Sequence, residues 1–437
     1  MLKTFPRGGV HPAENKMSAG KPIEILPLPD NVIIPVAQHL GVPSKPLVKR
    51  GDKVLTGQVI AQSEGFVSSN IHASVSGTVK KIDLVMDSSG YRKTAVFIQR
   101  EGDEWIDGVD LSDKLLTDFD LPAEEITKKV LEAGIVGLGG ATFPSHVKLS
   151  VPKGKKADTL IVNGVECEPY LTADEALMTG KAAEIAVGIK ILMRALGVDR
   201  AMIGIENNKP GAIQKMKEAV AGEPSITVHP LKVKYPQGGE KQLVKALLNK
   251  EVPSGGLPID IGVVAFNVGT IYAAYLAIQK KRPLVERVVT VTGKKIKSPA
   301  NFMARIGTPI SALIEAAGGL PENTGKIING GPMMGKALNN LEAPVVKGSS
   351  GIVVVDESES HRKKVRNCIR CGKCVTVCPM ALEPFLLQYM TSKGMFEQLE
   401  KERALDCMEC GSCSYICPAN RPLLDYIRYG KSTLRKI

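Results

Sequence analysis

Hydrophobic and polar positions follow different periods along the chain, and the first region has the period of β-strands. Residues 23–100 consist of short apolar and polar alternations separated by turn residues, including the stretches 51–62 and 71–83. A period of two indicates strands that bury one face and expose the other. The second stretch predicts a hairpin around Gly77. We therefore expect a small β-sandwich in the N-terminal part of the chain.

From residue 122 onward the pattern changes to apolar strands that alternate with helical segments. Thr172 and Glu175 have the spacing of a capping box and predict one helix that ends before Gly197. Alternating strands and helices predict a largely parallel sheet covered by helices. The expected strands are residues 157–163, 201–206 and 226–233, and the expected helices are residues 122–134, 172–196, 210–220 and 240–249.

Two smaller units follow. Residues 287–293 and 326–335 are strand-like around a helix-like segment at 309–317, and residues 383–404 are rich in helix formers. Between these units, proline, glycine, serine and acidic residues give residues 341–359 the composition of a connector. We therefore expect a multidomain α/β protein with parts at residues 1–110, 111–283, 284–340, 341–365 (a linker) and 366–437.

The composition is that of a globular protein with an excess of positive charge. Hydrophobic residues make up 43% of the chain, and the formal net charge of +12 favours anionic partners such as phosphorylated cofactors, acidic proteins or an anionic membrane surface. Aromatic residues make up only 4% and no basic helix is evident, so nucleic acid is not an expected partner. Basic residues that either face solvent or dock a partner occur at 361–366 and at Arg428, Lys431, Arg435 and Lys436.

The chain carries no signal for export or membrane insertion. Its N-terminus lacks the apolar region of a signal peptide, and no stretch approaches the roughly 18 uninterrupted apolar residues of a membrane span. Reduced cysteines are typical of the cytoplasm. We therefore expect a soluble or peripheral protein of that compartment.

Eight of the nine cysteines lie between residues 368 and 417. They form two runs with the spacing C-x2-C-x2-C-x3-C, each followed by proline, which is the pattern of a bacterial protein with two [4Fe–4S] clusters. In this pattern three cysteines of one run bind one cluster, and the cysteine before proline binds the other. The predicted ligand sets are Cys368, Cys371, Cys374 and Cys417 for one cluster, and Cys407, Cys410, Cys413 and Cys378 for the other.

Zinc and disulfides are the alternatives for these cysteines. Zinc ribbons use pairs of cysteines in four-ligand sites, in which a third cysteine in register and a Cys-Pro pair have no role. Four disulfides would require an oxidising compartment. The ninth cysteine, Cys167, is expected to be a small buried hydrophobic residue.

Glycine-rich and acidic loops follow the predicted strands of the α/β region. Residues 134–148 hold several glycines, which let a backbone bend tightly and be approached closely. Glu166 and Glu168 directly follow the strand 157–163, at the edge where open α/β sheets place their ligands. Two more loops, 235–241 and 266–270, follow later strands. A plain turn would explain one such loop, but four at one edge predict a binding site.

These loops, GLGGATFPSHVK, NGVECEP, YPQGGE and NVGT, resemble in order and spacing the flavin- and NADH-binding subunit of respiratory complex I. The resemblance implies a site for FMN and NAD(H). The implied FMN contacts are Gly137, Gly139, Lys148, Asn267 and Thr270, the last three at the phosphate. Gly140, Ala141 and Phe143 are implied to line the nicotinamide side, Asn163, Glu166 and Glu168 to meet both rings, and Tyr235, Gly238 and Glu240 to close the pocket. The chain departs from this family at Val165, Gly239 and Phe266, where polar residues are usual.

The resemblance extends to the other parts of the chain. The N-terminal β region resembles the barrel-sandwich hybrid of biotinyl and lipoyl carriers, but the loop 64–70 has no lysine, so a structural module is expected. Residues 287–335 look like a soluble-ligand-binding β-grasp module. Together with the stretch TFPRGGVHPAENK (4–16) and a helical ferredoxin-like end, nearly the whole chain resembles the C subunit family of Rnf ion-translocating electron-transport complexes.

This family resemblance implies an NAD(H)-dependent oxidoreductase subunit. FMN would pass electrons between NAD(H) and the two [4Fe–4S] clusters, without a catalytic side chain, while Glu166, Glu168 and Glu240 orient the rings. The implied partners are other subunits of a membrane complex, including a ferredoxin-like redox partner, with peripheral association at the cytoplasmic face. A cobalamin reductase of the propanediol-utilisation type and an electron-relay scaffold without flavin are the alternatives, and Val165 and Gly239 favour the scaffold.

Overall fold

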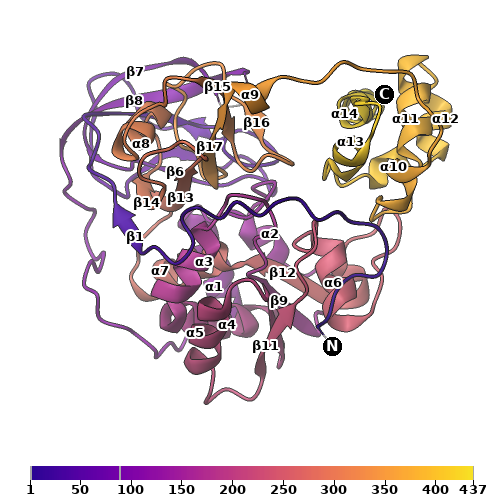
Figure 1. The fold of residues 1–437 in the computed structure, drawn as a ribbon. Coiled ribbons are helices and arrows are strands. Elements are labelled where there is room, and N and C mark those ends of the chain that lie inside the picture. Colours follow the sequence, from indigo (N-terminus) through magenta and orange to yellow (C-terminus); the bar gives the residue numbers. More distant parts are fainter. Residues whose placement is uncertain (1, 88–89, 437) are drawn as a thin grey trace.

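The computed structural model describes residues 2–87 and 90–436, so the predicted limits at residues 1 and 437 lie outside the described residues. Figure 1 shows an α/β layer that carries two β-rich units on one side and a group of short helices at one end. The N-terminal segment runs from beside α6 (Glu240–Leu248), beneath the short C-terminal helices, to β1 (Ile23–Ile25) at the opposite side. This arrangement confirms the predicted multidomain α/β class.

Two small sheets form the N-terminal β-sandwich. The four-stranded sheet has the order β2-β8-β7-β4, with bounds Asn31–Pro35, Arg92–Gly102, Ser76–Met86 and Lys53–Val54, and the three-stranded sheet is β3-β5-β6, with bounds Lys45–Pro46, Val59–Gln62 and Ile71–His72. The predicted hairpin around Gly77 is wrong. Gly77 lies within β7 at an irregularity of the pairing with β8, where an added Cβ would lie 2.0 Å from the carbonyl oxygen of Gln99. Glycine is therefore required there by close strand approach, not by a turn.

The central α/β unit is built on a parallel sheet, as predicted. Its order is β11-β10-β9-β12, with bounds Ile226–Leu231, Ala201–Glu206, Thr159–Asn163 and Val263–Asn267, and all three pairings are parallel. Buried side chains fill both faces, such as Leu160 on one face and Ile161 on the other, which is typical of a sheet covered by helices. The covering helices are α1 (Ala123–Glu132), α3 (Ala173–Gly180), α4 (Ala182–Leu196), α5 (Pro210–Ala219), α6 and α7 (Val268–Gln279).

The helix predicted over residues 172–196 is two helices, α3 and α4, which are separated at Lys181. The predicted capping box is also wrong. The Thr172 hydroxyl does not cap α3 but donates a hydrogen bond of 2.9 Å to the side-chain oxygen of Asn301. The carboxylate of Glu166 takes the capping role, because it accepts hydrogen bonds from the backbone amides of Asp174 (2.8 Å) and Glu175 (3.2 Å).

A six-stranded mixed sheet forms the β-grasp unit, with α8 (Ile310–Ala316). Its order is β1-β14-β13-β17-β15-β16, where β14 is Ala300–Arg305, β13 Glu286–Thr292, β17 Gly351–Asp356, β15 Thr324–Asn329 and β16 Lys336–Ala337. The linker predicted at residues 341–365 is therefore wrong for β17, which lies between β13 and β15. Its run of apolar β-branched residues is buried on both faces, and that burial outweighs the turn-forming composition of the preceding residues.

The C-terminal unit consists of short helices around the cysteine runs. They are α10 (Lys373–Thr376), α11 (Pro384–Ser392), α12 (Phe396–Lys401), α13 (Ser412–Ile416) and α14 (Leu423–Leu434). Leu387, Leu399 and Leu423 form their common core. An extended segment after α9 (Glu357–Ser360) crosses to this unit, which lies above α6 (Figure 1). Among residues 2–87 and 90–436, no helix has the length and apolarity that a bilayer crossing requires.

Candidate cofactor site

The glycine loop between α1 and α2 (Ser145–Leu149) is tightly held on one side and exposed on the other. Its two ends are joined by a hydrogen bond of 2.9 Å from the Gly137 amide to the Phe143 carbonyl oxygen. A Cβ on Gly139 would lie 2.6 Å from the Asn267 side-chain nitrogen, whereas one on Gly140 would meet nothing within 4 Å. Gly139, Gly140 and Ala141 are exposed. The loop therefore offers open backbone at the carboxyl edge of the parallel sheet, which fits a flat ring.

Two residues at the N-terminus of α7 shape this loop. The Asn267 side chain accepts a hydrogen bond from the Gly269 amide (2.8 Å) and donates one to the Asp174 carboxylate (2.7 Å). The buried Thr270 hydroxyl accepts a hydrogen bond of 2.9 Å from the Leu138 amide. Both side chains thus have protein partners, and they orient the helix end whose backbone amides favour a phosphate.

The two predicted acids contact backbone amides of different elements. Glu166, which has a positive φ of 49°, caps α3 as described above. The Glu168 carboxylate accepts hydrogen bonds from the amides of Met333 (3.2 Å) and Met334 (2.9 Å), in the turn between β15 and β16. Burial raises the pKa of Glu168 to about 7. Glu168 therefore joins the flavin-domain loop to the β-grasp unit.

Lys148 and Glu240 form an ion pair across the same edge of the sheet. The Lys148 ammonium lies 2.6 Å from the Glu240 carboxylate and donates a second hydrogen bond of 3.0 Å to the Ala265 carbonyl oxygen. Both side chains are partly exposed, at 31% and 39%. The pair is therefore accessible to a ligand, and the fixed ammonium is the chemical group that a phosphate requires.

The loop 235–240 lies between the acidic loop and the cysteine runs. The Asn163 side chain donates a hydrogen bond of 2.9 Å to the Gly238 carbonyl oxygen, and the Gly238 amide donates one of 3.3 Å to the Cys167 sulfur. Burial raises the pKa of Cys167, so its thiol stays protonated. The Tyr235 hydroxyl donates a hydrogen bond of 2.8 Å to the Cys410 carbonyl oxygen. This loop thus connects the predicted flavin site to a cysteine run.

Packing explains two departures from the complex I pattern. A Cβ on Gly239 would lie 2.5 Å from the terminal carbon of Met408 and 2.6 Å from the side-chain oxygen of Gln242, so a side chain at this position would displace both. Val165 is fully buried in an apolar cluster with Ile161 and Leu243. Neither departure removes the glycine loop or the α7 end, so neither argues against flavin.

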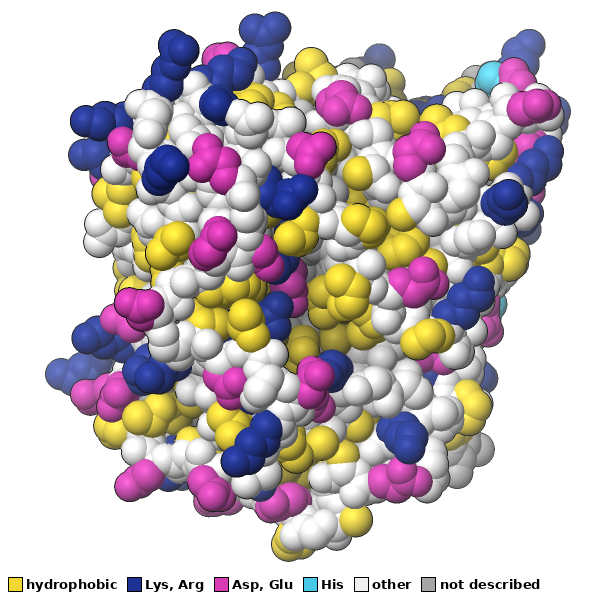
Figure 2. Space-filling model, turned by 90° about the vertical axis from the view of Figure 1, so that its left-hand side faces the viewer, with side chains coloured by type: hydrophobic (Ala, Val, Ile, Leu, Met, Phe, Trp, Pro, Cys, Tyr) yellow, Lys and Arg dark blue, Asp and Glu magenta, His cyan; other side chains and the backbone are white. Residues whose placement is uncertain are grey.

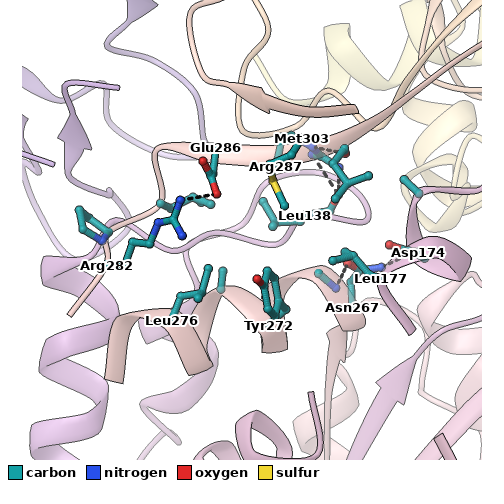
Figure 3. Close-up of a pocket in the computed structure, with 16 residues that line it drawn as sticks. Leu138, Asp174, Leu177, Asn267, Tyr272, Leu276, Arg282, Glu286, Arg287 and Met303 are labelled. Atoms are coloured by element: carbon teal, nitrogen blue, oxygen red, sulfur yellow. Dashed lines mark hydrogen bonds and ion pairs between the residues drawn. The ribbon is translucent and has the colours of Figure 1, made fainter. Parts of the chain in front are cut away.

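A pocket beside Leu138 contains charged residues that sequence reasoning missed. Figure 3 shows Asp174 pointing toward Asn267, and Arg287 reaching the Leu138 backbone. Burial, followed by the charge of Glu166, raises the pKa of Asp174 to about 7. Burial lowers the pKa of Arg287 to about 10. Both residues support the glycine loop, Asp174 through its hydrogen bond with Asn267 and Arg287 through its hydrogen bond with the Leu138 carbonyl oxygen. Neither belongs to a motif, so only the folded chain brings them together.

Four cysteines, which are those of one predicted ligand set, line a common cavity. A cavity with apolar walls is lined by the sulfur-bearing side chains of Cys378, Cys407, Cys410 and Cys413. Backbone amides of Leu382 and Glu409 donate hydrogen bonds of 3.4 Å to the sulfurs of Cys378 and Cys407, and such bonds stabilise cluster thiolates. Four sulfur donors in a mostly apolar cavity fit a [4Fe–4S] cluster.

The second group is more open to solvent. Cys374 lies close enough to Cys417 for the two thiols to interact electrostatically. Cys368 and Cys371 are exposed, as is every residue from 361 to 371. All four are cysteines of the predicted second ligand set, and their donor chemistry fits the same type of cluster.

Two of the basic residues near the C-terminus have structural roles. The Glu409 carboxylate, between Cys407 and Cys410, lies 3.1 Å from Arg428 and 2.7 Å from Lys431. Lys431 also donates a hydrogen bond of 2.5 Å to the Cys407 carbonyl oxygen. These cations therefore hold a cluster loop and are not free to dock a partner.

Curated relatives match the chain from end to end. The C subunit of the proton-translocating ferredoxin:NAD(+) oxidoreductase complex of Clostridium ljungdahlii is 48% identical over 438 residues, which cover 100% of this chain and 95% of the relative. The C subunit of the Na(+)-translocating complex of Acetobacterium woodii is 45% identical, with 97% and 96% covered. The chain belongs to this family of C subunits, called RnfC. The predicted family is therefore confirmed.

Family models divide the RnfC chain into four matched regions. They are described as the RnfC barrel sandwich hybrid domain (residues 3–103), the Nuo51 FMN-binding domain (130–276), the SLBB domain (288–337) and the 4Fe-4S dicluster domain (360–418). These matches confirm the predicted fold class and the predicted FMN and [4Fe–4S] cofactors. They also disfavour the scaffold without flavin.

A solved structure supports the fold alone. The NAD+-reducing [NiFe]-hydrogenase in its H2-reduced state aligns with a TM-score of 0.51 at 18% identity. The alignment covers 73% of the RnfC chain and 63% of the hydrogenase chain. The likeness therefore concerns the arrangement of the elements and not the chemistry.

Proposed function

We propose that this RnfC-family chain exchanges electrons between NAD(H), FMN and two [4Fe–4S] clusters as the electron-entry subunit of an ion-translocating ferredoxin:NAD(+) oxidoreductase complex. The contact between Tyr235 and Cys410 carries this proposal, because it joins the loop of the flavin site to a cluster loop within one chain. When bound, FMN supplies the exchange between two-electron hydride chemistry and one-electron chemistry.

The chain's own residues bind and orient the nucleotides. Gly137, Gly139 and Gly140 let the backbone approach a ring, and the α7 N-terminus with Lys148 offers positive groups to a phosphate. Glu166 and Glu168 hold the loop at which the nicotinamide would stack. Phe143, Ala141, Asn163, Gly238, Asn267 and Thr270 complete the proposed site, and no side chain is assigned a nucleophilic role.

The proposed order of electron transfer follows from burial. The cavity lined by Cys378, Cys407, Cys410 and Cys413 lies against the Tyr235 loop, so its cluster exchanges electrons with flavin. The cluster of Cys368, Cys371, Cys374 and Cys417 lies at the exposed segment 361–371 and exchanges electrons with partner subunits. We call these the inner and outer clusters. The ferredoxin-like partner within the complex would meet the outer one.

The surface charge fits association with a membrane complex. On the face in Figure 2, lysine and arginine side chains are interspersed with acidic ones around a hollow with apolar walls. In contrast, the exposed segment 361–366 is mostly basic and lies beside the outer cluster, which fits an acidic partner or an anionic leaflet. We therefore place the chain peripherally, at the cytoplasmic face of the membrane.

The proposed division of labour follows the domains, with β17 assigned to the β-grasp unit. Residues 1–110 support the flavin unit, which is residues 111–283. Residues 284–356 close the site through their contact with Glu168 of the flavin unit, and residues 366–437 hold the clusters. The reassignment of β17 leaves residues 357–365 as the connecting segment.

Anaerobic spectroscopy of the full chain with both clusters tests the function. NADH should bleach flavin and then reduce both clusters, which are followed by electron paramagnetic resonance. Cys368→Ser should lose the outer cluster while NADH still reduces the inner one. Cys410→Ser should keep the outer cluster but abolish its reduction by NADH. Cys167→Ser is the matched control and should behave as the unmodified chain. Outer-cluster reduction that survives Cys410→Ser would overturn the proposed order.

A further inference from the structure

The N-terminal segment at residues 3–18, here called the strap, contacts both the flavin unit and the cluster unit. Figure 1 shows it passing beneath the short C-terminal helices before it reaches β1. Phe5 and Val10 are buried, at 2% and 4% exposure. Isolated bridges join Lys3 to Leu231 and Val10 to Tyr235. The strap is therefore ordered by backbone pairing along the edge of the flavin unit, although it forms no long strand.

The middle of the strap touches the backbone of a cluster ligand. The Gly9 amide donates a hydrogen bond of 2.8 Å to the carbonyl oxygen of Val377, the residue before Cys378. Gly8 has a φ of +70°, and a Cβ there would lie 2.6 Å from the Cys378 carbonyl carbon and 2.7 Å from the Val377 carbonyl oxygen. Contact with backbone atoms cannot be relieved by rotating a side chain. Only glycine therefore fits against this cysteine.

The end of the strap holds the acidic loop of the flavin site. The ammonium of the half-buried Lys16 donates hydrogen bonds to the carbonyl oxygens of Glu166 (2.9 Å), Glu168 (2.8 Å) and Leu171 (2.6 Å). All three donors of the ammonium are thus used on one loop. The Ser18 hydroxyl lies 2.6 Å from the Thr172 hydroxyl, at the start of α3. Lys16 consequently fixes the backbone on which Glu166 and Glu168 stand.

Between these two ends, Val10 packs into the contact between the units. Both backbone hydrogen bonds link Val10 to Tyr235, at 2.8 Å and 2.9 Å. Val10, Tyr235 and Cys410 form one buried apolar cluster, with Val377 and Cys167 at its edge. The strap therefore touches the inner-cluster loop, the Tyr235 loop and the acidic loop in turn.

We propose that the strap is a positioning element that fixes the separation between the flavin-site loop and the inner cluster, with Gly8 and Lys16 as its two anchors. This proposal rests on the proposed function. Electron transfer slows steeply as the distance between carriers grows. A functional site also works poorly when the residues that support it leave it free to shift by a fraction of an ångström. Loosening the strap at Gly8, away from the acidic loop, should slow electron transfer to the inner cluster while leaving hydride exchange at the flavin site intact.

Gly8→Ala in the full chain with both clusters tests this role, and Gly20→Ala is its matched control. Gly20 has a φ of +72°, nearly that of Gly8, but a Cβ there meets nothing within 4 Å. Both variants carry the same backbone strain, and only Gly8→Ala collides with Cys378. We expect NADH-dependent reduction of a dye that accepts directly from flavin to stay within twofold in both. NADH-dependent reduction of the inner cluster should slow at least tenfold in Gly8→Ala only.

Amide hydrogen exchange without NADH gives a readout independent of activity. Exchange at Gly9 and Val10 should rise at least tenfold in Gly8→Ala and remain unchanged in Gly20→Ala. Lys16→Met is a second variant that does not touch the cysteine loop, and it should also slow cluster reduction. If Gly8→Ala fails to bind its clusters, Lys16→Met still tests whether the strap positions the inner cluster.

The outcomes separate the two proposals. If NADH reduces the inner cluster equally fast in the unmodified chain, Gly8→Ala and Lys16→Met, the strap does not position the cluster and the proposed function stands. If NADH reduces neither cluster in the unmodified chain with flavin bound, the proposed function fails, and the role of the strap fails with it.

Discussion

The hydroxyl oxygen of Tyr235 lies 2.8 Å from the carbonyl oxygen of Cys410, to which it donates a hydrogen bond. Both residues are buried, at 2% and 7% exposure. Burial raises the pKa of Tyr235, so the phenol keeps the proton that it donates. A buried polar contact of this kind is costly to break, because a buried carbonyl oxygen that loses its donor cannot turn to solvent. The flavin and cluster units therefore meet through a defined bond.

Tyr235→Phe should destabilise the chain by about 1–2 kcal/mol, since it leaves the Cys410 carbonyl oxygen unsatisfied. Denaturant unfolding of the protein measures the loss. Tyr389→Phe is the control, because Tyr389 on α11 is 52% exposed and its change should stay within roughly 0.5 kcal/mol. Equal stability of the two variants would contradict the importance of the bond.

Lys148→Ala should weaken FMN retention about tenfold, which corresponds to about 1.4 kcal/mol of binding free energy. The ammonium at the sheet edge would be lost, and the Glu240 carboxylate would lose its partner at 2.6 Å and repel a phosphate. The flavin content after gel filtration measures retention. Lys155→Ala removes an exposed lysine that pairs with Asp260, and it should retain flavin as the unmodified chain does. Equal flavin content in both variants would count against Lys148.

Glu168 should make stability depend on pH. Its pKa is raised by burial from 4.5 to about 7, so the folded chain binds the proton more tightly than the unfolded chain. The resulting stabilisation is fully present below pH 4.5 and is lost as the pH rises through about 7. From pH 5 to pH 8 the free energy of unfolding of the unmodified chain should therefore fall by on the order of 2 kcal/mol relative to that of Glu168→Gln, because one pKa unit corresponds to about 1.4 kcal/mol.

Denaturant unfolding of both proteins at several pH values checks this dependence. Asp174, whose pKa is also raised to about 7, is present in both proteins, so the difference isolates Glu168. Glu124→Gln, an exposed position on α1, should show no such trend. A constant difference between the unmodified chain and Glu168→Gln would contradict the burial of this carboxyl group.

Local pattern predicted the parallel sheet and the four cysteines that line one cavity, because strand period and cysteine spacing are properties of short stretches. It could not predict β17, whose flanking glycines and serines have loop composition and whose partners β13 and β15 are distant in sequence. Glu166 was predicted at the correct strand end, but its capping of α3 depends on the path of the loop. Lys16 lies in a recognised stretch, yet its three carbonyl partners lie about 150 residues further along the chain.

The cysteine grouping predicts which pairs of substitutions remove the same cluster. Cys378 lines one cavity with Cys407, Cys410 and Cys413, although it belongs to the other run. Cys378→Ser and Cys410→Ser should each remove about half of the bound iron, and their combination should remove no more, since both empty the inner site. Cys378→Ser combined with Cys374→Ser should remove nearly all of it, because Cys374 lies with Cys417 at the outer site. Iron analysis and electron paramagnetic resonance of the anaerobically prepared proteins measure the losses. The opposite result would mean that each run holds its own cluster. In that case Cys378→Ser combined with Cys374→Ser would halve the bound iron, and Cys378→Ser combined with Cys410→Ser would abolish it.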